Sequence, residues 1–317
     1  MKGKATKKKE IKEVVKEKYT KLAKLNKSCC CPSDEAANRA YVEALYNTEE
    51  IESLSKEVTD LSMGCGNPTA IANLKPGEVV LDLGSGGGID AFLAAKKVGP
   101  QGKVIGLDMT EEMIHRAQEN ARNMGITNVE FKLGEMESIP LPENSVDVVI
   151  SNCVINLSPD KDSVFREIFR VLKPKGRMVV SDIVTDGKLP KFITQNVEAW
   201  TSCIGGALKE EDYLAKIRAS GFSNVIVESK HIYSHEEVSM FKETNSSVFE
   251  KPLSPEEIKA VDGKIASIRV IAEKPTKEEK ACSCCRLRGE MYGKGEGRRY
   301  PPGIHRKVLR RTAYQGD

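Results

Sequence analysis

The chain has 317 residues, of which 39% are hydrophobic, 5% aromatic and 30% charged, so it can form one large α/β domain with tails or two small domains. No apolar run approaches the roughly 18 residues that a membrane span requires, and the charged start lacks the apolar centre of a signal peptide. These features argue against a membrane or secreted protein and favour a cytoplasmic one that contacts no membrane.

The net charge of +3 hides an uneven distribution. Residues 1–27 carry a net charge of +8 and residues 286–317 carry +6, which leaves −11 for the chain between them. An acidic body with two basic ends is not typical of a nucleic-acid-binding domain, although either end could contact an anionic surface.

The chain contains nine cysteines, an odd number that argues against a structural disulfide framework. Two clusters flank the body and three single cysteines lie within it: Cys29, Cys30 and Cys31, then Cys65, Cys153 and Cys203, then Cys282, Cys284 and Cys285. This arrangement indicates thiol chemistry or metal binding.

The first element in chain order is a basic helix over residues 7–27, whose apolar side chains (Ile11, Val14, Val15, Leu22 and Leu25) share one face. We expect it to pack on the body, with adhesion to an anionic surface or disorder as the alternatives. A second helical region is predicted over 34–47. A glycine- and proline-rich loop, SMGCGNPT, follows over 62–69 and carries Cys65.

From Val79 onward strands and helices alternate, which is typical of βαβ units on a parallel sheet with helices on both faces. The strands are predicted over 79–83, 103–107, 128–132, 146–150, 176–183, 223–227 and 267–275. The helices are predicted over 88–98, 111–124, 160–172 and 208–220, with Ser158 and Pro159 starting the third and the turn KPKGR (173–177) ending it. The arginine-rich end, 286–317, lacks periodicity and is predicted to be disordered.

A glycine loop follows the first strand directly. Gly84, Gly86 and Gly88 match the spacing that lets backbone approach a ligand closely at a helix N-terminus. The next strand ends at Asp108, where an acid can accept hydrogen bonds from ribose hydroxyls. Asp82 precedes the loop and would attract a cationic sulfonium cofactor but repel a pyrophosphate, so S-adenosylmethionine is favoured over NAD.

This order of a first strand, a glycine loop and an acid at the end of the second strand resembles the class I S-adenosylmethionine-dependent methyltransferases. The resemblance implies that Asp108 holds the ribose, that Glu135 and Met136 line the adenine and that the first loop faces the methionine part. The cofactor-binding residues expected on this basis are Asp82, Gly84, Ser85, Gly86, Asp108, Met109, Glu135, Met136, Ser151 and Asn152.

The residues after the fourth strand, Ser151-Asn152-Cys153-Val154, differ from the Asn/Asp-Pro-Pro-aromatic motif of enzymes that methylate base amino groups. No nucleic-acid substrate is therefore expected. The chain also lacks an obvious general base, because its histidines (His115, His231, His235 and His305) are expected to be surface or packing residues. A substrate that offers a lone pair on a soft atom fits this absence.

The three single cysteines lie on segments that leave the strand C-termini, where a doubly wound sheet forms its crevice. Three thiolates suit a trigonal soft ion better than zinc, which prefers four ligands or three plus water. Two alternatives remain open: these cysteines are small buried hydrophobic residues, or the two end clusters bind zinc.

SMGCGNP, VLDLGSG, SNCVINLSPDK and the Trp200–Cys203 region are similar to the arsenite S-adenosylmethionine methyltransferases, a resemblance that covers about residues 29–275. It implies that Cys65, Cys153 and Cys203 bind As(III), and that one cysteine of the N-terminal cluster, with Cys30 or Cys31 favoured, forms a redox pair with Cys65. The Cys282, Cys284 and Cys285 cluster is hypothesised to pass arsenic inward or to relay reducing equivalents.

The expected function is methyl transfer from S-adenosylmethionine to thiolate-bound arsenite and methylarsenite in arsenic detoxification. Cysteine disulfides would return the arsenic to its trivalent form, and thioredoxin or glutathione would reopen them. The alternatives are a class I methyltransferase for another small organic molecule and a thiol metalloid-binding protein.

The expected fold class is α/β, a Rossmann-like, seven-stranded, mostly parallel methyltransferase sheet with an N-terminal helical extension and a small C-terminal α+β addition. The expected parts are a basic helical extension (1–28), a cysteine-containing segment (29–78), the cofactor-binding domain (79–228), a segment completing the sheet and substrate region (229–280) and a cysteine cluster with a basic tail (281–317).

Overall fold

The computed structural model describes residues 2–25, 42–59, 64, 66–187, 189–190, 203–234, 237 and 255–279. The chain divides into two units, Met1–Thr276 and Lys277–Asp317. Several sequence predictions fall outside the described residues: those on Trp200, His235, His305, Cys65 and the two terminal cysteine clusters.

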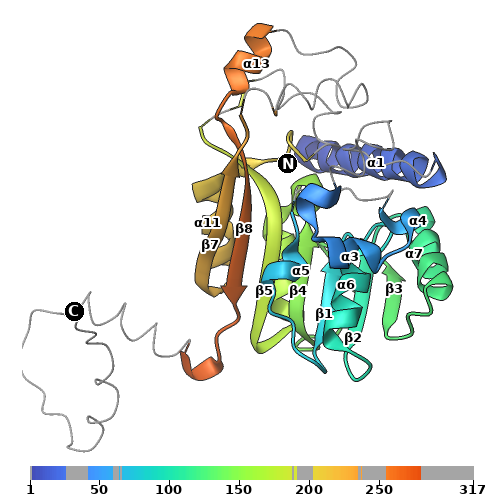
Figure 1. The fold of residues 1–317 in the computed structure, drawn as a ribbon. Helices are drawn as coiled ribbons and strands as arrows, with labels where there is room; N and C mark the ends of the chain where they lie inside the picture. The colour runs from blue at the N-terminus through green and yellow to red at the C-terminus, as the bar shows by residue number, and fades with distance from the viewer. Residues whose placement is uncertain are drawn as a thin grey trace, which may run out of the picture. The chain divides into compact units, whose positions relative to one another are not determined.

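The first unit is built on one twisted sheet (Figure 1). The order is β3 (Val129–Leu133), β2 (Lys103–Asp108), β1 (Val79–Leu83), β4 (Val146–Asn152), β5 (Leu172–Thr185), β8 (Ile265–Glu273) and β7 (Ser223–Ile232). A short strand, β6 (Leu208–Lys209), adds to β5. All pairings are parallel except those of β8, which is antiparallel to both neighbours. The predicted fold class is confirmed.

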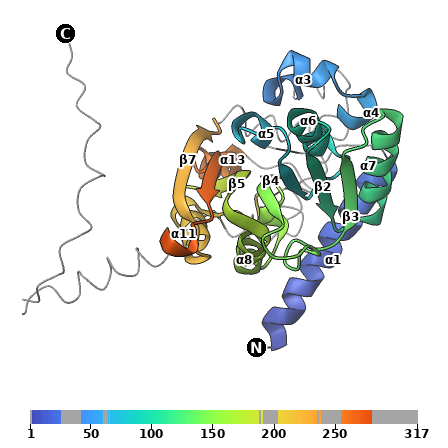
Figure 2. The ribbon, with the colours of Figure 1, turned by 90° about the horizontal axis from the view of Figure 1, so that it is seen from below.

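Helices cover both faces of this sheet (Figure 2). The described helices are α1 (Lys2–Leu25), α3 (Thr48–Glu52), α4 (Lys56–Thr59), α5 (Pro68–Ile71), α6 (Ile89–Val98), α7 (Glu111–Asn123), α8 (Lys161–Val171), α11 (Glu210–Ala219) and α13 (Pro255–Val261), with a 3-10 turn, η1, at Ile155–Leu157. No helix among these is long and apolar enough to cross a membrane.

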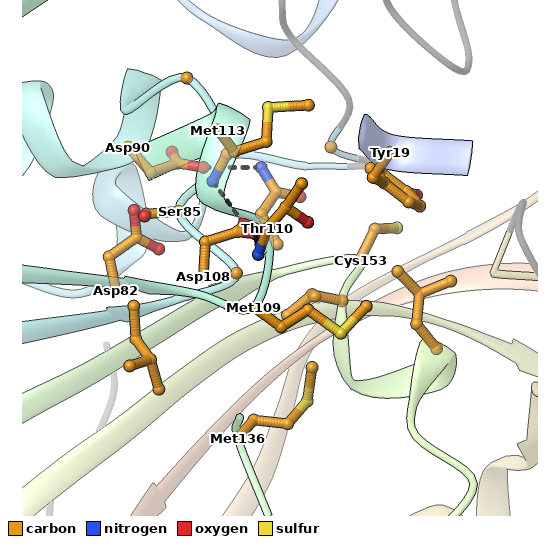
Figure 3. Close-up of a pocket in the computed structure, with 18 of the residues that line it drawn as sticks. Tyr19, Asp82, Ser85, Asp90, Asp108, Met109, Thr110, Met113, Met136 and Cys153 are labelled. Carbon is orange, nitrogen blue, oxygen red and sulfur yellow. Dashed lines mark hydrogen bonds between the residues drawn. The ribbon is translucent and has the colours of Figure 1, made fainter. Parts of the chain in front are cut away.

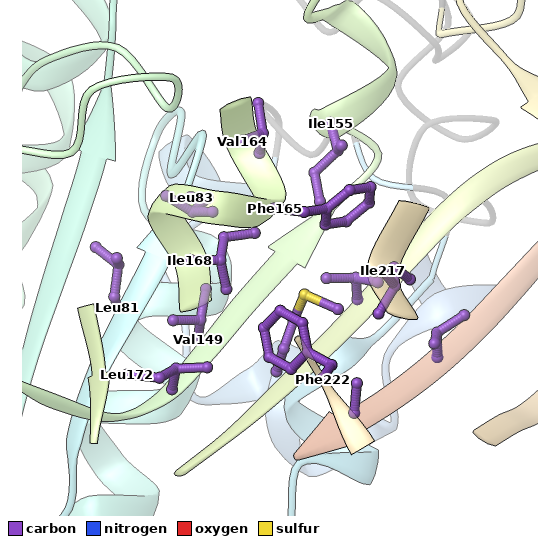
Figure 4. Packing of buried hydrophobic residues seen from close by; sticks show 14 of the residues in the cluster. Leu81, Leu83, Val149, Ile155, Val164, Phe165, Ile168, Leu172, Ile217 and Phe222 are labelled. Carbon is purple, nitrogen blue, oxygen red and sulfur yellow. The ribbon is translucent and has the colours of Figure 1, made fainter. Parts of the chain in front are cut away.

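The alternation of side chains along the central strands creates two apolar cores, one on each face. Val80 of β1 and Val148 of β4 pack in the core that includes residues of α6 and α7. Their neighbours Leu81 and Val149 face the opposite way, into the core that includes α8 and α11 (Figure 4). Because both faces are buried, these strands are almost continuously apolar.

An aromatic pair joins the two helices of the second core. The rings of Phe165 in α8 and Tyr213 in α11 meet edge to face, with centroids 5.4 Å apart, and both side chains are fully buried. This geometry suits the ring quadrupoles and fixes how α8 and α11 lie against β5.

Three local predictions were wrong. Helix α8 is capped by Asp160, whose side chain accepts from the Ser163 amide, whereas Ser158 accepts from the Asp160 amide and thus stabilises the cap. The predicted turn at 173–177 lies inside β5 as an irregularity, with Lys175 at a φ of 65°. On α1, Val15 is buried as expected but Val14 is 38% exposed, because only one side of the helix contacts the body.

Candidate active site

A pocket opens at the C-terminal ends of β1, β2 and β4, where the glycine loop lies between β1 and α6. The backbone amides of Gly84 and Ser85 both donate to the Leu107 carbonyl, at 2.7 and 3.0 Å, and so tie the loop to β2. A side chain at Gly84 would meet Val154 at 2.3 Å, and Gly84 has a φ of 67°. Glycine is therefore required there by both space and backbone conformation.

Most of the predicted cofactor residues line this pocket (Figure 3). They are Asp82, Gly84, Ser85, Gly86, Asp108, Met109, Met136 and Asn152. Glu135 and Ser151 are not among the lining residues, since Glu135 is directed to Lys12 and Ser151 is buried within β4. The sequence reasoning missed Lys12, Tyr19, Gly64, Asp90, Thr110 and Glu137. Gly64 lies in the SMGCGNPT loop, but that loop was singled out for Cys65 alone.

Three carboxyl groups converge on the pocket from β1, α6 and the end of β2: Asp82 and Asp90 are buried and Asp108 is half-buried. Burial, reinforced by Asp90 and Asp108, raises the pKa of Asp82 well above its usual value. Burial likewise raises the pKa of Asp90 to about 6, against the opposing hydrogen bonds from Asn152 and Tyr46. Burial also raises the pKa of Asp108. Such a cluster favours a bound cation, which would offset the cost of its charges.

The polar atoms without a partner in the described structure indicate where that cation binds. Oδ2 of Asp82 and Oγ of Ser85 are buried and accept or donate no hydrogen bond among the described residues. An ammonium group with a nearby sulfonium, as in S-adenosylmethionine, would satisfy them, because it brings both positive charge and N–H donors. These residues therefore fit the expected cofactor.

Asp108 is held rigidly at the end of β2. The Gly86 amide donates to one carboxylate oxygen at 3.0 Å and the Thr110 amide donates to the other at 2.9 Å. These bonds hold the carboxylate at the end of β2, where the sequence predicts that it accepts from ribose hydroxyls.

Helix α1 contributes to the pocket from outside the sheet. Lys12 and Tyr19 are lining residues, and Lys12 Nζ lies 2.7 Å from Glu135 and 3.1 Å from Glu137. Burial opposes the charge of Lys12, but the hydrogen bonds with both glutamates outweigh it and raise the lysine pKa. The basic N-terminal segment thus pairs with the acidic body at the cofactor pocket.

Cys153 lines the pocket, and Cys203 contacts Cys153 from outside the lining. Both are buried, with 6% and 4% exposed, and they share an apolar cluster with Val15 of α1 and Ile183 of β5. The thiol of Cys203 donates to the Cys153 carbonyl. Both cysteines have left-handed backbone, with φ of 59° and 67°, which is rare for residues with a side chain.

The two thiols differ in their redox state. Cys203 carries a thiol, whereas Cys153 is disulfide-bonded. The sequence predicted a disulfide between Cys65 and the N-terminal cluster, and did not anticipate a bond at Cys153. Cys153 must therefore be reduced before its sulfur can bind a soft ion as a thiolate.

A buried polar network lies behind the two cysteines. Lys161 Nζ donates to the carbonyls of Asn156 and Ser158, at 3.2 and 3.0 Å. Burial lowers the pKa of Lys161 to about 8, opposed by Asp182 and Cys203, and burial raises the pKa of Asp182 to about 7, opposed by Lys161. The sequence reasoning missed this network because a lysine after a capping segment resembles an ordinary surface residue.

The described histidines lie away from the pocket. His231 is an exposed residue of β7 paired with Glu237 at 2.8 Å, and His115 is an exposed residue of α7. Within the described ranges, no three His, Cys, Asp or Glu side chains are placed so that they could hold a metal ion.

Comparisons with known proteins agree with this geometry. Residues 74–243 match a family model described as a methyltransferase domain. An arsenite methyltransferase from Halobacterium salinarum is 42% identical over 233 residues, which cover 70% of this chain and 59% of that protein. The human arsenite methyltransferase is 35% identical over 185 residues, covering 55% of this chain and 48% of its own length. The chain thus spans about half to three fifths of these relatives.

A solved structure extends the comparison. The arsenic(III) S-adenosylmethionine methyltransferase from Chlamydomonas reinhardtii superposes with a TM-score of 0.58 at 33% identity, covering 76% of this chain and 74% of that one.

Proposed function

We propose that this chain, which belongs to the family of arsenic(III) S-adenosylmethionine methyltransferases, transfers methyl groups to trivalent arsenic bound by its own cysteine thiolates. The observation that carries the proposal is the position of Cys153 and Cys203, which are buried side by side at the edge of a pocket lined by three acids. Soft sulfur ligands and an electrophilic methyl donor would then share one crevice.

Arsenite binding would replace hydroxide by sulfur. As(OH)₃ reacts with three thiols to form three As–S bonds and releases three waters, so that the arsenic lone pair points away from the sulfurs. We assign these thiols to Cys65, Cys153 and Cys203, and methylarsenite, with one position already occupied by carbon, would need only two of them. S-adenosylmethionine supplies a methyl group activated by its sulfonium charge, so the protein must supply placement rather than acid–base assistance.

The cysteines would also return the arsenic to its trivalent state. The lone pair that forms the As–C bond leaves arsenic formally pentavalent, and two thiolates that close to a disulfide return two electrons to it. Cys65 paired with Cys30 or Cys31 is the expected redox couple. Thioredoxin or glutathione would reopen the disulfide, and the cytoplasm would keep these ligands reduced.

The decisive test is incubation of the protein with arsenite, S-adenosylmethionine and a thiol reductant, followed by separation of the arsenic products. We expect methylated arsenic to form only when all three are present. If no methylated arsenic forms with thioredoxin, glutathione or a synthetic dithiol, the proposal is wrong.

The same assay distinguishes the proposed function from two alternatives. A methyltransferase for an organic small molecule would turn over without arsenite and would tolerate Cys153→Ser. A metalloid-binding protein would bind arsenite and the cofactor but produce no methylated arsenic. The apposed cysteines disfavour the first and the complete cofactor pocket disfavours the second.

A further inference from the structure

Helix α1 contacts the pocket through one of its faces. Lys12 and Tyr19 line the pocket, and Val15 between them is fully buried. These residues are three and four positions apart, the spacing that places side chains on one face of a helix. Val15 belongs to the apolar cluster of Cys153 and Cys203. The Tyr19 ring packs against that cluster on the Cys153 side of the pocket (Figure 3). One face of α1 therefore contacts both the methyl-donor pocket and the two cysteines.

Glu137 joins this helix to the segment that follows Cys153. Its Oε2 lies 3.1 Å from Lys12 Nζ, and its Oε1 accepts from the Ser158 hydroxyl at 2.6 Å. Glu137 and Ser158 both line the pocket. A carboxylate can accept at each of its two oxygens, so this one side chain binds both partners at once.

The position of Glu137 is fixed by α8. Ser158 is buried, and its Oγ accepts from the Asp160 amide at 3.0 Å, directly before the helix. Two residues beyond Glu137, the Ile139 amide donates to Glu167 of α8 at 2.8 Å. Glu137 is therefore held by the body of the fold, and α1 is held by Glu137.

Glu135 pairs with the same lysine but in a different setting. Its Oε2 lies 2.7 Å from Lys12 Nζ, yet its side chain is 55% exposed, against 11% for Glu137. Glu135 is also not among the lining residues of the pocket. Water and salt screen an exposed pair, so we expect the Glu137 pair to contribute more to the docking of α1.

A second attachment lies nearer the end of α1. Thr20 Oγ1 donates to Glu112 of α7 at 3.3 Å, and Lys24 Nζ lies 3.3 Å from the same carboxylate. Lys24 is exposed, and both distances are longer than those of Lys12. Of these two attachments, the one at Glu137 is the closer and the more buried.

From these contacts we infer that Glu137 is a positioning residue that holds α1 over the methyl-donor pocket and the two cysteines. With the helix docked, its apolar face excludes water from the place where the methyl donor and the sulfur ligands meet. When the contact with Lys12 breaks, the helix leaves the pocket and solvent reaches the cofactor and the cysteines. This role goes beyond the proposed function and does not depend on which acceptor the cysteines bind.

The test measures two rates in the reduced full-length protein: alkylation of Cys203 by iodoacetamide, followed by peptide mass spectrometry, and dissociation of S-adenosylmethionine. In Glu137→Gln the amide can still accept from Ser158 but offers an N–H group instead of a charge to Lys12. We expect both rates to rise about fivefold, the scale of losing a charged hydrogen bond at a partly buried site. Glu135→Gln is the matched control, because it loses a pair with the same lysine, and should change either rate less than about twofold.

A double variant distinguishes this role from a merely structural one. If Glu137 acts through Lys12, then Glu137→Gln combined with Lys12→Met should raise the alkylation rate no further than Lys12→Met alone. Multiplied effects in the double variant, unchanged rates in Glu137→Gln, or an equal rise in Glu135→Gln would each overturn the inference. Thermal unfolding confirms that each variant is folded.

A second pair of variants releases the helix without changing Glu137. Val15→Asp places a charge in the apolar cluster, so α1 should undock and both rates should rise about tenfold or more. Val14→Asp, at the neighbouring exposed site, should leave both rates within about twofold of the wild type. An unchanged alkylation rate in Val15→Asp would overturn the inference. Absence of arsenic methylation by the wild type would instead overturn the proposed function and leave this inference standing.

Discussion

The two described cysteines of the site are held by backbone that few side-chain-bearing residues adopt. Cys153, directly after β4, and Cys203 both have left-handed φ values and lie in one buried apolar cluster. The sequence indicated that the cysteines follow strands, but it gave no sign of these φ values, because neither cysteine is flanked by a turn motif that demands them.

Replacing single cysteines tests which of the proposed ligands are needed for arsenite and which for methylarsenite. We expect Cys153→Ser and Cys203→Ser to reduce methylation of both arsenite and methylarsenite by roughly a hundredfold or more, because a hydroxyl does not replace a soft thiolate. Cys65→Ser should reduce mainly the methylation of arsenite. Initial rates on the two substrates measure this, and equal rates on both in the Cys65 variant would contradict it.

The buried carboxyl of Asp82 should lower the stability of the cofactor-free protein at neutral pH and strengthen the binding of S-adenosylmethionine. The pKa of Asp82 is raised in the fold, so its protonated form is favoured, and the cofactor-free protein should lose stability as the pH rises above the ordinary value of 3.8. Asp90, whose pKa is raised to about 6, adds to the loss between its ordinary value of 3.8 and about pH 6. Asp82→Asn should flatten this decline, yet bind S-adenosylmethionine about tenfold more weakly or worse.

Thermal unfolding at pH 5 and pH 8, with and without cofactor, measures both effects. A steeper decline in the Asp82→Asn protein than in the wild type would show that the carboxyl is stabilised in the fold as an anion, contrary to its burial.

At the scale of elements, the strands and helices of the sheet were predictable because their apolar patterns are long and continuous. The order of the last two strands was not, since β8 inserts antiparallel between β5 and β7, and local sequence does not encode that pairing. The KPKG segment inside β5 shows the same limit, as tertiary pairing of Lys175 with Lys274 overrides turn-forming residues. The position of α1 at the cofactor pocket could not be predicted from the sequence either.

A substitution in α1 tests whether the position of this helix at the pocket affects the binding of S-adenosylmethionine. Lys12→Met removes the pairing with Glu135 and Glu137, and we expect S-adenosylmethionine to bind about two- to fivefold more weakly, since the pair is only partly buried. High salt should weaken binding to the wild type in the same direction and leave the variant less affected. Lys16→Met, an exposed change on the same helix, is the control. Equal effects of the two substitutions would argue against a specific role of Lys12.

At the scale of the whole molecule, the division at Thr276 predicts that the fold does not depend on the C-terminal unit. A protein ending at Thr276 should unfold within about 2 °C of the full chain and keep its maximal methylation rate. Its rate at low arsenite should fall if the C-terminal cysteines deliver arsenic.

A triple variant of the full chain, in which serine replaces Cys282, Cys284 and Cys285, separates the effect of these cysteines from that of the basic tail. An unchanged rate at low arsenite in this triple variant would remove the delivery hypothesis.

The left-handed backbone at Cys153 and Cys203 also has an evolutionary consequence. Glycine adopts these φ values without cost, and a cysteine codon becomes a glycine codon by a single base change. A mutation of either proposed arsenic ligand to glycine would therefore leave the local backbone unstrained. Under the proposed function, a descendant could lose its methyl acceptor by one base change and still fold and bind the cofactor.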